Sequence, residues 1–267
     1  MNRRNFLTLS AGAVAGLLLE KELKAASMQA TSASSFGLVA ITFDDGYRSA
    51  YDVARPIMGK DIPGSECLVP SWTGMGWNGQ LTWDQVWILY NDFHWEIVNH
   101  TISHQNLTTL EDQQIIKAVM DAEDAFMSHG IVTNRALAPP YGAFNDQVVD
   151  VLQNAGVVSS LRHAWMYVDG INHPATFDPW AIEAYYVSKR TTFADLKAKI
   201  DQAVAYNGLF VPVVHNVSSN PSDDSDMSAK VLQDVCNYIR QLARANKASA
   251  VTLSHGVAHM MRAQSIL

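Results

Sequence analysis

Two adjacent carboxylates, Asp44 and Asp45, follow an apolar run that begins at Leu38 and precede a glycine, Gly46. On a β-strand, neighbouring side chains point to opposite faces. The two carboxylates can therefore face one point only where the strand ends and the backbone turns, and Gly46 permits such a turn. Because adjacent carboxylates repel each other, we expect a cation beside them.

Two histidines that suit a metal ion lie downstream, at His100 and His104. Imidazoles four residues apart share a face if the segment forms a helical turn. Together with one carboxylate they would form a three-ligand site that leaves positions for water, as in a catalytic zinc site. An Asp-Asp-Gly sequence alone is more often only a turn. Both groups, however, come directly after strand-like apolar runs, which favours a shared metal site.

These residues need a scaffold that brings the ends of several strands together. Strand-like and helix-like segments alternate along the chain, which is typical of a parallel sheet covered by helices. We expect strands at 38–43, 67–69, 95–99, 157–160, 185–187, 209–214 and 250–253. We expect helices at 47–58, 82–90, 111–127, 146–155, 193–206 and 229–245, with Thr82 and Asn145 as N-caps and Gly156 as a stop.

Several polar groups occupy the same kind of position. Asp44, Asp45, His100, Tyr141 and His215 each come just after a strand-like run. In an α/β barrel, the carboxyl ends of the strands form the edge where the chemistry takes place. We therefore expect these side chains to meet there.

The first residues have the features of an export signal. Arg3 and Arg4 form a twin-arginine pattern, and the apolar segment 7–19 is shorter than the roughly 20 residues that a membrane-spanning helix needs. We expect residues 1–26 to be an export signal and 27–36 a linker, and the protein to act in the periplasm or outside the cell without a stable membrane anchor after cleavage. An uncleaved anchor is the alternative.

Composition limits the partners. The formal net charge of −7 becomes −9 when residues 1–26, with four basic and two acidic side chains, are removed. Such an acidic protein is unsuited to nucleic acid and better matched to a neutral or amine-bearing substrate. Two cysteines, Cys67 and Cys236, provide no disulfide framework. The remaining residues, 37–267, suit one α/β domain.

Four motifs, taken in order, resemble those of the polysaccharide deacetylase family (carbohydrate esterase family 4). They are Thr42-Phe43-Asp44-Asp45-Gly46, His100-Thr101-x-x-His104, Pro140-Tyr141-Gly142 and Val213-Val214-His215. The Ala-Pro-Pro-Tyr-Gly and Val-Val-His-Asn-Val segments are most similar to the branch that acts on poly-N-acetylglucosamine. The resemblance implies a single-domain, distorted (β/α)7 barrel that removes acetyl groups from N-acetylated polysaccharides or oligosaccharides.

The resemblance implies a metal site and a reaction. Asp45, His100 and His104 would hold one divalent metal ion, and their nitrogen and oxygen donors match Zn²⁺ best. Asp44 would be the general base for the metal-bound water, whose pKa the ion lowers. His215 would be the general acid that protonates the departing amine.

Further roles concern the oxyanion and the substrate. The resemblance places the backbone N–H of Tyr141 at the oxyanion, and its side chain is a candidate for binding substrate. Trp72 and Trp77 suit stacking on sugar rings, with packing of their own loop as the alternative. Asp178, followed by Pro179-Trp180, is a candidate for orienting His215, although an aspartate before proline is more often part of a turn.

One position departs from the family and leaves a second function open. Ala138 stands where the family usually has an arginine that steadies the base carboxylate, and its absence would raise the pKa of Asp44 or loosen its orientation. Arg135 and Arg162 are candidates to replace that arginine. An acetylglycan-binding protein with weak or no turnover is therefore the alternative to a deacetylase. An O-acetyl esterase or a cyclic amide hydrolase is also compatible with the motifs.

Overall fold

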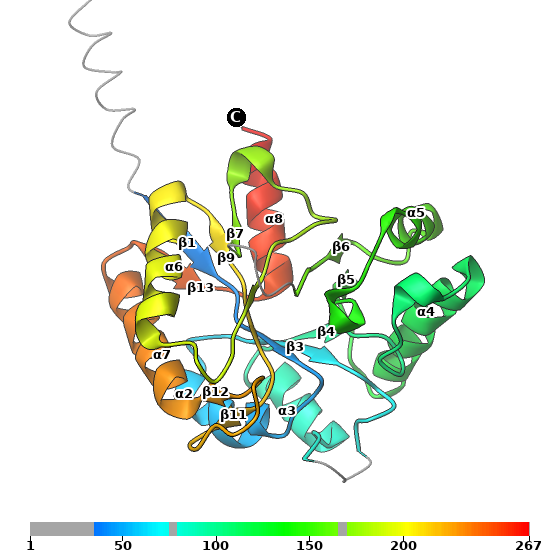
Figure 1. The fold of residues 1–267 in the computed structure, drawn as a ribbon, viewed down its shortest axis with the longest axis horizontal. Coiled ribbons are helices and arrows are strands. Elements are labelled where there is room, and N and C mark those ends of the chain that lie inside the picture. The colour runs from blue at the N-terminus through cyan, green and yellow to red at the C-terminus, as the bar shows by residue number, and fades with distance from the viewer. Residues whose placement is uncertain (1–34, 75–78, 165–169, 267) are drawn as a thin grey trace, which may run out of the picture. The chain divides into compact units, whose positions relative to one another are not determined.

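Seven parallel strands form the sheet that carries the candidate residues (Figure 1). The computed structural model of the chain describes residues 35–74, 79–164 and 170–266, so the predicted signal, most of the linker and Trp77 lie outside the described residues. The strand order is β6-β5-β4-β3-β2-β10-β8. The bounds are β2 Thr42–Asp44, β3 Ser65–Leu68, β4 Glu96–Asn99, β5 Ala136–Leu137, β6 Ser160–Leu161, β8 Tyr185–Tyr186 and β10 Pro212–Val214.

The sheet curls strongly into an open barrel, which confirms the predicted distorted (β/α)7 fold. Every neighbouring pair of strands in it is parallel. Among the described residues, the edge strands β6 and β8 do not pair with each other. Near this open edge a single isolated bridge joins Arg162 to Ile182.

A second sheet of four strands continues the first. Its order is β13 (Ala248–Ala250), β1 (Gly37–Val39), β9 (Leu209–Phe210) and β7 (Ile171–Asn172). β1 and β2 are two parts of the predicted strand 38–43, and β9 and β10 are two parts of the predicted strand 209–214. β7, which runs antiparallel to β9, was not predicted.

Helices lie against the outer side of the sheets (Figure 1). A π-helical turn, Ala50–Ala54, leads into α2 (Arg55–Met58). The others are α3 Trp83–Asp92, α4 Asp112–Ser128, α5 Asp146–Ala155, α6 Phe193–Tyr206, α7 Ala229–Arg244 and α8 Leu253–Gln264. The predicted caps are confirmed: Thr82 forms a capping box on α3, Asn145 caps α5, and Gly156 ends α5 in the left-handed region. None of the described helices is long and apolar enough to cross a membrane.

The strand predicted at 250–253 lies two residues earlier in the chain, so the predicted bounds were wrong. β13 ends at Ala250, and Leu253 begins α8, whose residues Leu253, Val257 and Met260 are buried. Gly256 weakens the helical signal of this segment. The structure needs that glycine, because a Cβ there would come within 2.9 Å of the side chain of Leu209.

Alternate strand residues pack on opposite faces of the seven-stranded sheet. Phe43, Leu68 and Ile97 belong to the larger apolar cluster. Residues on the other face form a second cluster rich in small side chains, among them Ala40, Cys67, Ala136, Ala138 and Ala184. Asp44 pairs with Cys67 in the ladder between β2 and β3, so its side chain lies on this second face. Small neighbours leave room there for long polar side chains.

Candidate metal centre

The backbone turns sharply where β2 ends at Asp44. Asp45 and Gly46 have φ values of 75° and 72°, a region that non-glycine residues seldom adopt. The N–H of Asp45 donates to the carbonyl of Cys67 at 3.1 Å. The amide of Gln80, oriented to satisfy both groups, donates to the carbonyls of Asp45 at 2.6 Å and Gly46 at 2.7 Å. The turn brings both carboxylates to one edge of the sheet, as predicted.

His100 and His104 meet through a loop, and the expected helical turn was wrong. Thr101 and His104 have positive φ values of 62° and 59°, so the segment reverses on itself. The side chain of Asn99 holds this loop: its Oδ1 accepts from the N–H of Thr101 at 2.8 Å, and its Nδ2 donates to the carbonyl of Val119 at 3.0 Å. The two imidazole rings lie with their centroids 4.9 Å apart.

Donor atoms of Asp45, His100 and His104 converge on one point. The Nε2 atoms of His100 and His104 lie 3.3 and 3.1 Å from Oδ1 of Asp45. In a tetrahedral zinc site with bonds of about 2.0–2.1 Å, neighbouring ligand atoms lie about 3.3 Å apart. Nδ1 of His100 donates to the carbonyl of Ala138 at 2.5 Å, which leaves the Nε2 lone pair available for a metal.

The environment of Asp45 also fits a cation. Its Oδ1 is buried and has no hydrogen-bond partner among the described residues. Burial would raise the pKa of Asp45, but the nearby imidazoles of His100 and His104, with a further contribution from His215, hold it well below its usual value. The carboxylate is therefore ionised, and these three donor residues fit a divalent metal ion.

Asp44 has a different partner, a buried arginine. Nη2 of Arg162 donates to Oδ1 of Asp44 at 2.8 Å and to Oδ2 at 2.7 Å, and the Arg162 side chain is fully buried. Burial would raise the pKa of Asp44, but the Arg162 guanidinium, with help from His100 and His215, holds it below its usual value. The rise in pKa that the missing arginine alone would cause does not occur, because Arg162, one of the two candidate replacements, supplies the cation.

Of the two arginines considered, only Arg162 reaches the site. Arg135 is exposed, and its Nη1 donates to the carbonyl of Gly156 at 3.4 Å. Arg135 lies close to Ala138 in the chain, whereas Arg162 is far from it in sequence and is brought to its level by the pairing of β5 with β6.

A cavity of about 310 Å³ collects the predicted residues. It is lined by Asp44, Asp45, Tyr47, His100, His104, Tyr141, Gly142, Ala164, Tyr186, His215 and Ser225. His215 lies one residue beyond β10 with its Nε2 3.9 Å from Oδ2 of Asp45. The metal triad, Asp44, Tyr141 and His215 therefore share one cavity.

Tyr141 enters the cavity from a strained turn. Its φ is 61°, the residue is 68% exposed, and its ring centroid lies 4.6 Å from that of His104. Such conformations persist where the surrounding structure enforces them, as at many functional sites. The next residue, Gly142, has φ 63°, and a Cβ there would come within 2.8 Å of the backbone nitrogen of Ala164.

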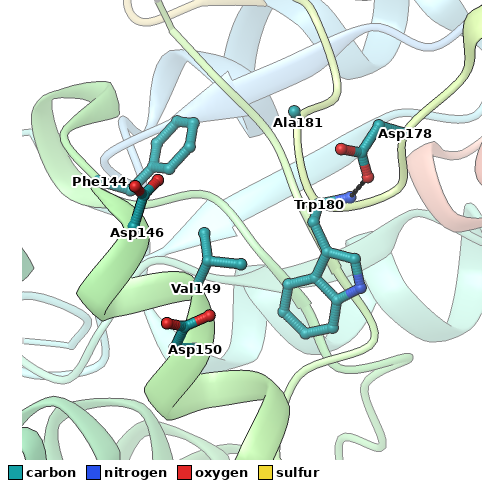
Figure 2. A pocket seen from close by; sticks show the side chains of 7 residues that line it. All are labelled: Phe144, Asp146, Val149, Asp150, Asp178, Trp180 and Ala181. Atoms are coloured by element: carbon teal, nitrogen blue, oxygen red, sulfur yellow. Dashed lines mark hydrogen bonds between the residues drawn. The ribbon is translucent and has the colours of Figure 1, made fainter.

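Two of the predicted substrate contacts lie elsewhere or beside the cavity. The centroid of the Trp72 ring lies 4.9 Å from that of the His104 ring, beside the loop that carries His100 and His104. Asp178 lines a different pocket of about 400 Å³, with Phe144, Asp146, Val149, Asp150, Trp180 and Ala181 (Figure 2). Its Oδ1 accepts from the N–H of Trp180 at 2.8 Å. Asp178 is therefore part of a turn, which was the alternative to its orienting His215. Nδ1 of His215 has no partner among the described residues.

Five further residues line the cavity but were not named as site residues from the sequence: Tyr47, Gly142, Ala164, Tyr186 and Ser225. Tyr47 follows the Asp-Asp-Gly turn, Tyr186 ends β8, and Ser225 lies in the loop between β11 (Val217–Ser218) and β12 (Met227–Ser228). The ring of Tyr186 lies 5.4 Å from that of His215. An aromatic residue at the carboxyl end of a predicted strand was the available signal for Tyr186.

Comparison with known proteins supports one family. Residues 32–159, just under half of the chain, match the family model described as polysaccharide deacetylase. This segment includes the metal triad, Asp44 and Tyr141, but ends before Arg162 and His215. No curated protein matches the chain.

Solved structures share the fold at low sequence identity. The deacetylase PplD of Streptococcus pyogenes, in complex with acetate, is 20% identical, with a TM-score of 0.51 over 60% of this chain and 69% of its own. A family 4 carbohydrate esterase from Streptomyces lividans, also with acetate, is 16% identical, with a TM-score of 0.52 over 82% and 95%. BA3943 of Bacillus anthracis, a pseudoenzyme of the CE4 family, is 17% identical, with a TM-score of 0.53 over 84% and 66%. The fold thus occurs in enzymes and in a pseudoenzyme.

Proposed function

We propose that this chain, whose sequence match and fold support its place in the polysaccharide deacetylase family (carbohydrate esterase family 4), is a metal-dependent hydrolase that removes acetyl groups from N-acetylated polysaccharides or oligosaccharides. One observation carries the proposal: the triad of Asp45, His100 and His104 shares a cavity with an ionised carboxylate, Asp44, that is not part of the triad. Zn²⁺ suits these donors best, and when bound it polarises the acetyl carbonyl and makes water more acidic.

The side chains divide the remaining work. Asp44 accepts a proton from the attacking water as the water oxygen bonds to the acetyl carbon. The N–H of Tyr141 donates to the former carbonyl oxygen, which has become negatively charged. His215 gives a proton to the amide nitrogen as the carbon–nitrogen bond breaks. Acetate and the free amine leave.

The substrate proposal follows from the cavity walls. Tyr47, Tyr141 and Tyr186 surround the polar centre, and Trp72 lies beside it, which suits the apolar faces of a sugar ring. The negative net charge of the chain is compatible with the positively charged amines that the reaction produces. We place the substrate among poly-N-acetylglucosamine-like glycans outside the cytoplasm, reached by export through residues 1–26.

An acetylglycan-binding protein without turnover is the second candidate. The existence of a pseudoenzyme with this fold supports it, and a mutant of that pseudoenzyme has restored activity. The two candidates differ in one measurable quantity, the release of acetate by metal-loaded protein. An O-acetyl esterase or a cyclic amide hydrolase differs from both in the substrate it consumes.

The test is an acetate-release assay on N-acetylated chitooligosaccharides, with the purified protein first stripped of metal and then loaded with Zn²⁺. We expect release only after loading, and a loss of about 10²–10⁴-fold in kcat in Asp44→Asn, the size of a general-base contribution. Asp44→Asn should still bind Zn²⁺, as shown by calorimetry. Oligosaccharide binding without acetate release by the loaded wild type would favour the binding protein. Parallel assays on O-acetylated sugars and on a small cyclic amide identify the other enzymes.

A further inference from the structure

We infer that Arg162 is a positioning residue for the catalytic base, supplying from the neighbouring strand the cation that position 138 lacks. The inference rests on the proposed function in one respect, namely that Asp44 acts as the general base. The contact between Arg162 and Asp44, and its consequence for where Asp44 points, do not depend on that function.

Strand register places the arginine opposite the alanine. β5 and β6 pair in parallel with Leu137 opposite Leu161, and the N–H of Arg162 donates to the carbonyl of Leu137 at 2.9 Å. The next residues along the ladder are Ala138 and Arg162. Residues at the same level of adjacent parallel strands project from the same face. The guanidinium therefore enters at the level of position 138, one strand further along the sheet.

Within the part of the chain that the structure describes, Arg162 has Asp44 as its ionic partner. Its side chain is fully buried, and among the described residues its guanidinium contacts Asp44 and, at 3.6 Å, the sulfur of Cys67. Nε and Nη1 have no partner there. A buried charge without a partner is costly, so the pair with Asp44 is strongly favoured. The small side chains of Ala138 and Cys67 provide the space.

This contact determines what Asp44 can do. Asp44 is adjacent in sequence to Asp45, and a free carboxylate there would be a competing ligand for a cation on the triad. One nitrogen of Arg162 donates to both oxygens of Asp44. We expect this contact to fix the direction of the carboxylate and to keep it from competing for a metal on the triad. Arg162 thus keeps Asp44 available as a base without touching the substrate itself.

The experiment compares full-length Arg162→Met and Arg162→Lys with Arg135→Ala, a matched control because Arg135 is an exposed arginine outside the cavity. We expect Arg162→Met to lower kcat for acetate release about 100-fold, the loss that follows misplacement of a reacting group by about 1 Å. The KM of this variant should not rise, and its affinity for Zn²⁺, measured by calorimetry, should not fall. Arg162→Lys should recover part of kcat, since an ammonium binds a carboxylate with less directional control. Arg135→Ala should match the wild type.

A transplant adds a second line of evidence. Arg162→Ala combined with Ala138→Arg returns the guanidinium to the neighbouring strand. If the two positions are equivalent, the folded double variant recovers most of the activity lost in Arg162→Ala. A folded double variant with no recovery counts against the inference.

Other results overturn the inference in distinct ways. Unchanged kcat in Arg162→Met overturns it and leaves the proposed function intact. A parallel loss of kcat, Zn²⁺ affinity and melting temperature assigns Arg162 a structural role only. If the wild type releases no acetate, the proposed function fails, and crystal structures of the zinc-loaded wild type and Arg162→Met still decide: the inference requires Asp44 to lie off the metal in the first and to change direction in the second.

Discussion

At the residue scale, two neighbouring carboxylates are separated by their partners. Asp44 ends a strand and pairs with Arg162, whereas Asp45 turns into the left-handed region and faces His100 and His104. The separation arises from strand alternation followed by one strained residue. Two chemically identical side chains can therefore take different tasks.

A third carboxylate near this pair, Glu66, is buried without a hydrogen-bond partner among the described residues. Burial, with the charges of Asp44 and Asp45, raises its pKa well above the usual value. Because the folded state holds the proton more tightly than the unfolded state, the stability of the protein falls as pH rises above the unfolded-state value of about 4.3.

Glu66→Gln should therefore stabilise the protein, and more so at pH 8 than at pH 5. We expect a gain in melting temperature of about 2–4 °C at pH 8, which corresponds to roughly 1 kcal/mol at this chain length. Thermal melts in chelator at both pH values measure it without a contribution from bound metal. An equal gain at the two pH values would show that the carboxyl group does not titrate between them.

Residue types and spacing were enough to predict that Asp45, His100 and His104 lie together with Asp44 beside them. They did not select between Arg135 and Arg162, because that choice depends on the register of two strands of two residues each. The role of Asp178 next to His215 also failed to find support, since the carboxylate binds its own turn. Local patterns indicate which groups take part, but long-range pairing decides which of them meet.

At the element scale, α4 anchors the loop that carries His100 and His104. Asn99 bonds both to the loop and to the carbonyl of Val119 in α4, and the N–H of Ile102 donates to the carbonyl of Ala118 at 2.9 Å. The loop contains left-handed residues, a conformation that surrounding contacts such as those to the helix help to maintain.

Asn99→Ala should loosen this loop and weaken zinc binding by about 10–100-fold, the usual effect of removing a group that orients metal ligands. Calorimetric titration of the metal-free variant measures the change. Asn145→Ala is the matched control: it removes an N-cap from α5 and costs about 1 kcal/mol of stability. Zinc affinity should be normal in the control. Normal affinity in Asn99→Ala would show that the loop is rigid without its amide.

Most elements could be predicted because their caps and apolar spacing are local. The long strands at 38–43 and 209–214 were predicted as single elements, whereas each divides between two sheets. Such a division depends on which partners each half finds, and the apolar run does not contain that information. Leu253 was assigned to a strand for a similar reason: the burial of α8 against Leu209 outweighs the weak helix propensity of Gly256.

At the scale of the whole molecule, a metal that binds only the folded chain must stabilise all of it. With Zn²⁺ at 100 times its dissociation constant, the gain is about 2.7 kcal/mol. For a chain of this size that corresponds to a rise of about 5–10 °C in melting temperature.

His104→Ala should abolish this rise, as measured by thermal melts with Zn²⁺ and with chelator. His259→Ala replaces an exposed histidine on α8 and should keep the full rise. A metal-dependent rise that survives His104→Ala would place the ion elsewhere, and the same loss in both variants would point to nonspecific binding by surface imidazoles.

The gap between β6 and β8 has a consequence for how the molecule tolerates heat. The N–H of His163 donates to the carbonyl of Ile182 at 2.8 Å, and the N–H of Ile182 donates to the carbonyl of Leu161 at 3.0 Å. These few hydrogen bonds connect the two edges of the open barrel. Arg162, which lies between Leu161 and His163, donates to the carboxylate of Asp44. Under the proposed function, we therefore expect moderate heating to disturb Asp44, and with it acetate release, before the rest of the sheet unfolds.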